Sequence, residues 1–145
     1  MSPNHKTPRS LCPINLGLEV FGDKWTLIVI RDLLFFGKRH FKELMQAEEG
    51  IASNILTERI RRLETEGIIS REKDPRSGRR MIYRLTDKGL ALAPILLEIA
   101  RWSHRHGGSV LSDSFIDRVE NDRDALLDEV LEAARAGATV LSDPA

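Results

Sequence analysis

Apolar residues recur every three to four positions through much of the chain, and short glycine-containing stretches separate the segments in which they recur. This spacing is typical of amphipathic helices, and a glycine just after the last apolar residue is a common helix end. The helices predicted in the first half span residues 11–21, 24–36, 40–47 and 52–66. Apolar side chains cover more than one face of the second helix, so we expect it at the centre of a core.

The pattern changes after Gly67. Residues 68–73 and 80–85 have the character of β-strands, and Met81, Tyr83 and Leu85 occupy every second position of the second strand. The segment between them, residues 74–79, is rich in residues that favour turns. Two strands around a basic turn, directly after two helices joined by a short link, predict a winged helix-turn-helix. The predicted fold class is therefore mainly α with a small β-hairpin wing and additional dimerisation helices.

The helix over residues 52–66 has two different faces. At about 100° per residue, an apolar stripe forms on one side from Leu56, Ile60 and Leu63. The opposite side carries the short polar residues Ser53, Asn54 and Thr57, together with Arg61. Small polar residues in the first turns of a helix and a basic residue further on suit the major groove of DNA. The alternative is a solvated face with no binding role.

Charge is distributed unevenly although the formal net charge is zero. Residues 51–84 hold nine Lys/Arg and five Asp/Glu, whereas residues 107–145 hold three Lys/Arg and nine Asp/Glu. A basic middle segment suits a polyanionic partner such as double-stranded DNA. We therefore expect Arg76, Arg79 and Arg80 of the wing to bind beside or within the minor groove. Further contacts to backbone phosphates are expected from Lys38, Arg39 and Arg62. His40 lies near the start of the predicted helix 40–47, and we expect it either to cap that helix or to contact a phosphate.

The second half of the chain predicts two more helical regions. A helix capped by Thr86 is expected to run to about His106, with a kink at Pro94. Its apolar character favours dimerisation as the cover for its surface, and packing inside the same chain is the alternative. Residues 113–136 predict one amphipathic helix or a pair of helices along the dimer seam.

Length and composition limit the number of domains and the class of protein. A chain of 145 residues corresponds to about one domain. We divide it into a disordered arm (1–10), a winged-helix domain with a dimerisation helix (11–106) and an acidic helical tail (107–145). One cysteine excludes a disulfide within the chain, and no apolar run is long enough to span a bilayer. Together with the lack of a secretory signal, these features favour a cytoplasmic protein without membrane contact.

Four motifs together resemble one family of bacterial regulators. They are CPINLGLEVFGDKWTLIVIRDLL, GKRHFKEL, GIASNILTERIRRLETEGII and YRLTDKG. In this combination the chain resembles the HxlR-type transcriptional regulators, relatives of the MarR group, over about residues 12–102. The resemblance implies a homodimer whose helix 52–66 enters the major groove while the wing touches the flanking backbone. It also makes Cys12 a candidate sensor of oxidants or electrophiles, because some relatives use a cysteine at this position.

Other roles were weighed against these. For Cys12, the alternative is a small buried residue. The sequence contains no phosphate-binding glycine loop, and one cysteine and four histidines give no zinc-type spacing. We therefore predict no enzyme activity, no metal and no cofactor. An apolar pocket between subunits for a small-molecule effector is compatible with the sequence, although no pattern demands one. The alternative function is a winged-helix protein-interaction module without a DNA target.

Overall fold

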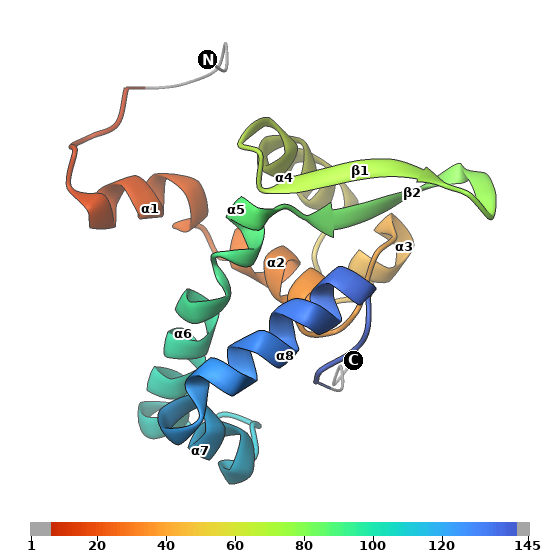
Figure 1. The fold of residues 1–145 in the computed structure, drawn as a ribbon. Coiled ribbons are helices and arrows are strands. Elements are labelled where there is room, and N and C mark those ends of the chain that lie inside the picture. Colours follow the sequence, from red (N-terminus) through yellow and green to blue (C-terminus); the bar gives the residue numbers. More distant parts are fainter. Residues whose placement is uncertain (1–6, 142–145) are drawn as a thin grey trace.

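The computed structural model describes residues 7–141, and Figure 1 shows their arrangement. The elements in chain order are α1 (Pro13–Phe21), α2 (Thr26–Leu34), α3 (Phe41–Leu44), α4 (Ser53–Thr65), β1 (Ile69–Asp74), β2 (Ser77–Leu85), α5 (Asp87–Leu90), α6 (Ala93–His106), α7 (Asp113–Asn121) and α8 (Arg123–Ala136). This order confirms the predicted fold class of helices with one β-hairpin. Of the predicted disordered arm, residues 1–6 lie outside the described residues.

The helix-turn-helix is built around α2, as its apolar sequence predicted. Ile30 and Leu34 of α2 are completely buried. The predicted stripe of α4 is buried with Ile30 in one hydrophobic cluster, and it consists of Leu56, Ile60 and Leu63. Since burying an aliphatic side chain stabilises the fold by about 1.5–3 kcal/mol, these residues hold α4 against the core and leave its other face outside.

The wing is an antiparallel hairpin with a two-residue turn. Ile69 pairs with Leu85 and Arg71 with Tyr83. Asp74 pairs with Ser77, so β2 starts three residues earlier than the predicted strand at 80–85, and only two residues form the turn. The reason is local: the Asp74 carboxylate accepts a hydrogen bond from the Arg76 backbone N–H at 2.9 Å and closes the turn. Figure 1 shows that the hairpin tip projects from the body.

The predicted kinked helix over residues 86–106 is two helices. Thr86 caps α5 as predicted, accepting a hydrogen bond from the Gly89 backbone N–H. Pro94 lies in the first turn of α6, where a helix has no need of its N–H, so it begins a helix instead of kinking one. Gly89 packs so closely on the Ile68 carbonyl that a Cβ atom there would lie 2.3 Å from the oxygen. This close approach holds α5 against the residue that precedes β1.

The acidic tail packs on its own chain. Its helices α7 and α8 contribute buried Val119, Leu126 and Val130 to a second hydrophobic cluster, which also contains Leu34 and Phe35 of the α2 region. The expectation that the apolar stripe of the tail lies along a dimer seam is therefore wrong for these buried residues. An amphipathic helix has one apolar face, and the α2 region and α6 already cover that face of the tail helices.

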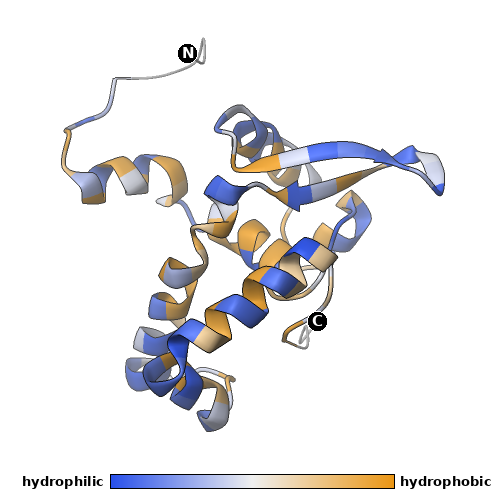
Figure 2. Cartoon of the chain, in the orientation of Figure 1, coloured by the Kyte–Doolittle hydropathy of each residue, from blue (hydrophilic) through white to orange (hydrophobic). Residues whose placement is uncertain are grey.

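Exposed apolar side chains gather at α1 and α6. No residue of α1 is buried, and Leu11 and Ile14 are 80% and 75% exposed. On α6, Ile99 and Trp102 are 47% and 66% exposed. Figure 2 shows hydrophobic colouring along α1, which lies apart from the hairpin. The fold leaves these two helices with uncovered apolar surface, whereas most of the buried apolar residues belong to the two clusters.

Candidate nucleic-acid interface

The outer face of α4 carries four polar side chains on a rigid helix. Ser53, Asn54, Thr57 and Arg61 are all exposed, as the helical spacing predicted. The Thr57 hydroxyl donates to the Ser53 carbonyl at 2.8 Å, which fixes its orientation on the helix. Among residues 7–141, no carboxylate forms an ion pair with Arg61. The face therefore presents hydroxyl, amide and guanidinium groups outward, the groups that hydrogen-bond to base edges.

The wing turn is organised by one buried carboxylate. Asp74 is 5% exposed; besides the Arg76 N–H, it lies 3.1 Å from an Arg80 guanidinium nitrogen. The Arg76 N–H, more than any other group, lowers the pKa of Asp74 from its ordinary value. Within the described part of the chain, the exposed guanidinium groups of Arg76 and Arg79 form no ion pair. Arg76 and Arg79 are thus available to an outside anion, whereas Arg80 is engaged by Asp74.

His40 joins α3 to the wing. Its Nδ1 lies 2.8 Å from a Glu43 carboxylate oxygen, and its Nε2 lies 3.1 Å from an Asp74 oxygen. His40 and Glu43 form a capping box at the start of α3, so the two side chains satisfy backbone groups that a helix start leaves open. Both ring nitrogens are used inside the protein. This placement supports a capping role for His40 and gives no support to the expected phosphate contact.

Lys38 was expected to hold a phosphate, but it is buried. It is 7% exposed, and its ammonium lies 3.2 Å from the carboxylate of Asp32, which is 1% exposed. Burial raises the pKa of Asp32, and the charges of Arg31 and Lys38 act against that rise. A buried charge needs a partner, so Lys38 cannot leave Asp32 for a phosphate without a large cost. The expectation for Lys38 is corrected on this ground.

Arg39 is bound to the end of the tail. Its guanidinium donates to the Ala136 carbonyl at the C-terminus of α8, where a cation is favourable because carbonyl groups there lack helical partners. The guanidinium also lies directly against Gly137, whose φ of +68° suits glycine. A phosphate contact from Arg39 would compete with this hydrogen bond.

Arg62 is the last of the expected phosphate contacts, and it is also held within the protein. One guanidinium nitrogen donates to the Asp23 carboxylate at 2.8 Å and to the Val20 carbonyl at 3.2 Å. The Asp23 carboxylate also accepts hydrogen bonds from the backbone N–H groups of Trp25 and Thr26 at the start of α2. The sequence signal for its pairing with Arg62 was the arginine on each flank of the apolar stripe of α4, since such partly buried arginines require an acceptor.

Cys12 is exposed and occupies the N-cap position of α1. The alternative of a small buried residue is therefore wrong. Hydrogen bonding from the backbone N–H of Asn15, and next of Ile14, lowers the pKa of the thiol from its usual value. A lower pKa increases the thiolate fraction, which is the reactive form of cysteine.

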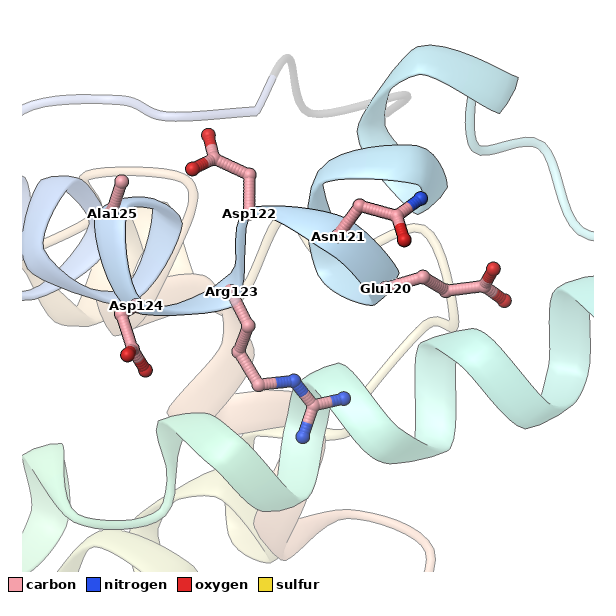
Figure 3. A pocket seen from close by; sticks show the side chains of 6 residues that line it. All are labelled: Glu120, Asn121, Asp122, Arg123, Asp124 and Ala125. Atoms are coloured by element: carbon pink, nitrogen blue, oxygen red, sulfur yellow. The ribbon is translucent and has the colours of Figure 1, made fainter.

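Sites for small ligands are poorly developed. A shallow depression lies at the α7–α8 junction, and Figure 3 shows its mostly polar lining of Glu120, Asn121, Asp122, Arg123, Asp124 and Ala125. A second depression lies beside α4 and includes Arg61 and Tyr83. Across residues 7–141, no group of three or more His, Cys, Asp or Glu side chains could hold a metal ion. None of the helices described in that range combines the length and apolar character needed to cross a bilayer.

Comparison with known proteins agrees with this geometry. Residues 20–110 match the model of the HxlR-like helix-turn-helix family. YvaP, an HTH-type transcriptional regulator of Bacillus subtilis, is 36% identical over 94 residues, which cover 64% of this chain and 86% of YvaP. PA1607, assigned as a transcription factor, superposes with a TM-score of 0.63 at 34% identity over 72% of each chain.

A third similar protein is YodB, an HTH-type transcriptional regulator of Bacillus subtilis. Its reduced form superposes with a TM-score of 0.55 at 28% identity, over 68% of this chain and 96% of YodB. YodB has also been solved after diamide treatment and with a bound quinone.

Proposed function

The chain belongs to the HxlR-like helix-turn-helix family and is a transcriptional regulator, and from this premise we propose that it binds DNA as a homodimer on an inverted repeat. The relatives named above are regulators and not enzymes. One observation carries the proposal: the exposed polar face of α4 lies on the same structural unit as a wing whose Arg76 and Arg79 are exposed and without ion pairs in the described range.

In the proposed complex α4 occupies the major groove. Ser53, Asn54, Thr57 and Arg61 read base edges, because hydroxyl, amide and guanidinium groups match the donor and acceptor patterns exposed there. The apolar stripe on the other side of α4 supports this role, since it holds the helix rigidly against the core. A rigid helix carries base-reading groups more accurately than a loop does.

The wing supplies the sequence-independent part of binding. Arg76 and Arg79 contact backbone phosphates or enter the minor groove beside the α4 site, and Arg80 does so in part, since 55% of its side chain is exposed while one nitrogen pairs with Asp74. Phosphate contacts set register and affinity without reading sequence. Four residues are left out of the phosphate-binding set, because each has at least one side-chain nitrogen bonded within the chain and lies outside the wing: Lys38, Arg39, His40 and Arg62.

Dimerisation would cover the apolar surface that the fold leaves open. Leu11, Ile14 and Trp102 are each at least 66% exposed, and they come from α1, the residues before it, and α6. A two-fold dimer buries the same patch from both copies, and two recognition helices related by the axis require a palindromic site. The buried stripe of the tail takes no part in this interface.

We assign a redox or electrophile response to Cys12. The specific observation is its exposed thiol at the start of α1 with a lowered pKa. The proposal is supported by the similarity to YodB, whose diamide-treated and quinone-bound forms have been solved. An oxidant or electrophile that reacts with Cys12 would act next to the proposed dimer surface.

Selection of bound sequences from a random duplex pool tests the function. We expect enrichment of an inverted repeat with half-site centres about 10 bp apart, or a multiple of that spacing. Sedimentation of the free protein at micromolar concentration should give a dimer. Arg118→Ala is the control, because Arg118 lies on α7 and pairs with Glu129, and this variant should select the same sequence. Failure to retain any duplex at low salt would instead favour the protein-interaction module.

A further inference from the structure

Asp23 accepts hydrogen bonds from two separate elements. One carboxylate oxygen accepts from the backbone N–H groups of Trp25 and Thr26 at 2.8 and 3.0 Å, and from Nε of Arg59 at 3.0 Å. The other accepts from the Thr26 hydroxyl at 2.5 Å and from a guanidinium nitrogen of Arg62 at 2.8 Å. The carboxylate therefore caps the start of α2 and, at the same time, holds two arginines of α4.

Arg62 extends this connection to α1. The same guanidinium nitrogen lies 3.0 Å from the Thr26 hydroxyl oxygen and 3.2 Å from the Val20 carbonyl at the end of α1. Thr26 is completely buried, so the connection reaches into the interior. Hydrogen bonds that involve charged groups are roughly twice as strong as neutral ones. The Asp23 cluster, defined as Asp23, Thr26, Arg59 and Arg62, thus joins α1, α2 and α4.

The Asp23 cluster can fix the rotation of α4 about its own axis, which apolar packing alone does not determine. Burial of the apolar stripe draws α4 onto the core, but the hydrophobic effect has no direction. Hydrogen bonds are directional. Arg59 and Arg62 lie about one turn apart and bind different oxygens of one carboxylate, so together they oppose rotation of α4 about its own axis.

Rotation matters because the proposed base-reading residues lie on the same helix. A side chain ends about 5–6 Å from the helix axis, so a turn of about 10° moves it by about 1 Å. A hydrogen bond of about 2.9 Å does not survive a displacement of that size with good geometry. Arg61 directly precedes Arg62, so its direction changes with any rotation that the cluster permits.

We infer that Asp23 is a positioning residue for base recognition, which sets the rotation of α4 through Arg59 and Arg62. The inference rests on the proposed function, because it requires α4 to read bases. Asp23 itself does not touch DNA in this arrangement. Arg62 then holds α4 in place from inside the protein, instead of making the phosphate contact expected from the sequence.

The test compares variants on two duplexes, the sequence selected by the wild-type protein and a scrambled sequence of the same composition. Asp23→Asn keeps one oxygen to cap α2 and removes the charge that holds the arginines. Arg62→Ala removes the other side of the contact, and its site is half-exposed, so the fold should persist. Glu129→Gln is the matched control, because it neutralises a carboxylate paired with Arg118 at 2.7 Å in the tail. Affinities are measured at several salt concentrations and at a temperature where circular dichroism shows every variant folded.

We expect Asp23→Asn and Arg62→Ala to weaken binding to the selected duplex by about tenfold or more, within the range for losing one base contact. Affinity for the scrambled duplex and its salt dependence should stay at the wild-type value, and the double variant should be no weaker than Asp23→Asn alone, because that substitution already removes the charge that holds both arginines. Glu129→Gln should match wild type on both duplexes.

Two results would overturn the inference. If Arg62→Ala weakens binding to both duplexes equally and reduces the slope of log affinity against log salt concentration by about 0.9, Arg62 contacts a phosphate. If folded Asp23→Asn keeps the wild-type ratio of the two affinities, the core alone positions α4. Failure of the proposed function has a separate signature, since the wild-type protein would then show no preference between the duplexes.

Discussion

The Nε2 atom of His40 lies 3.1 Å from a carboxylate oxygen of Asp74, and this contact ties the start of α3 to the turn of the wing. Asp74 also holds the Arg76 N–H and the Arg80 guanidinium. Asp74 and its partners therefore connect the turn of the wing to the start of α3.

Replacing His40 should loosen the wing. We expect His40→Ala to increase amide hydrogen exchange in β1 and β2, and to weaken DNA binding by a similar factor on all sequences. The control is His104→Ala, because His104 also bridges two groups, Ser109 and Asp113, but lies outside the proposed DNA interface. Hydrogen-exchange mass spectrometry makes the measurement. Unchanged exchange across the hairpin in His40→Ala would show that strand pairing alone holds the wing.

The Asp23 carboxylate should make folding depend on acid pH. Partial burial alone would raise its pKa, but hydrogen bonds from the Thr26 hydroxyl, the Trp25 N–H and Arg59 outweigh burial and hold the pKa well below its ordinary value. A lowered folded-state pKa means that the stabilisation is present above the unfolded-state pKa of about 3.9 and is lost as the pH falls further.

Wild type should therefore exceed Asp23→Asn in free energy of unfolding by about 1–2 kcal/mol near pH 7. The difference should shrink steadily as the pH falls from about 4 towards 2. Urea unfolding at a series of pH values measures it. A difference that stays constant down to pH 2 would mean that the carboxylate charge contributes nothing to the folded state.

Contacts between residues that are close in the sequence could be predicted from it, whereas contacts between residues that are far apart could not. Helical spacing located the buried stripe and the exposed face of α4, because residues three and four apart share a face. It could not find the partner of Arg62, since Asp23 is 39 positions away, or that of Arg39, since Ala136 is 97 positions away. Charge alone marked Lys38 as a phosphate ligand, and only tertiary packing buries it against Asp32.

The tail illustrates the same limit. Its amphipathic pattern was clear, but a pattern does not say whether the same chain or a second copy covers the apolar side. The described residues place Leu126 and Val130 against the α2 region. Removal of residues 107–145 should for this reason disturb the winged-helix core itself.

A single core substitution tests this packing. Leu126 is 1% exposed, so Leu126→Ala should lower the free energy of unfolding by about 2–5 kcal/mol. Its neighbour Leu127 is only partly buried, and Leu127→Ala should cost less. Because the cluster includes Leu34 and Phe35, unfolding of Leu126→Ala should remain one cooperative transition in denaturant. Separate transitions for the tail and the remainder would contradict a shared core.

Cys12 should make DNA binding sensitive to oxidation. Diamide converts two thiols to a disulfide and is itself reduced, and each chain has one cysteine. In the absence of added thiol the disulfide must therefore join two chains. We expect a covalent dimer on a non-reducing gel and a lower affinity for the selected duplex, both reversed by dithiothreitol. Cys12→Ser should show neither effect. An identical response of wild type and Cys12→Ser would remove Cys12 as the sensor.

Removing the two kinds of DNA contact assigned to this protein should change DNA affinity in different ways. Arg61→Ala should cost on the order of 1–3 kcal/mol on the selected duplex and relax the preference at one base position in each half-site. Arg76→Ala combined with Arg79→Ala should weaken binding to all sequences, because it removes charges that neutralise phosphates.

The most direct measurement is the affinity of wild type, Arg61→Ala and the double wing variant for selected and scrambled duplexes over a range of salt concentrations. The account predicts that Arg61→Ala loses affinity only for the selected duplex, at an unchanged salt slope. It predicts that the wing variant loses affinity for both, with a slope smaller by about 0.9 for each phosphate contact removed. Equal losses on both duplexes for Arg61→Ala, or no loss for either variant, would contradict the assignment of base reading to α4 and backbone binding to the wing.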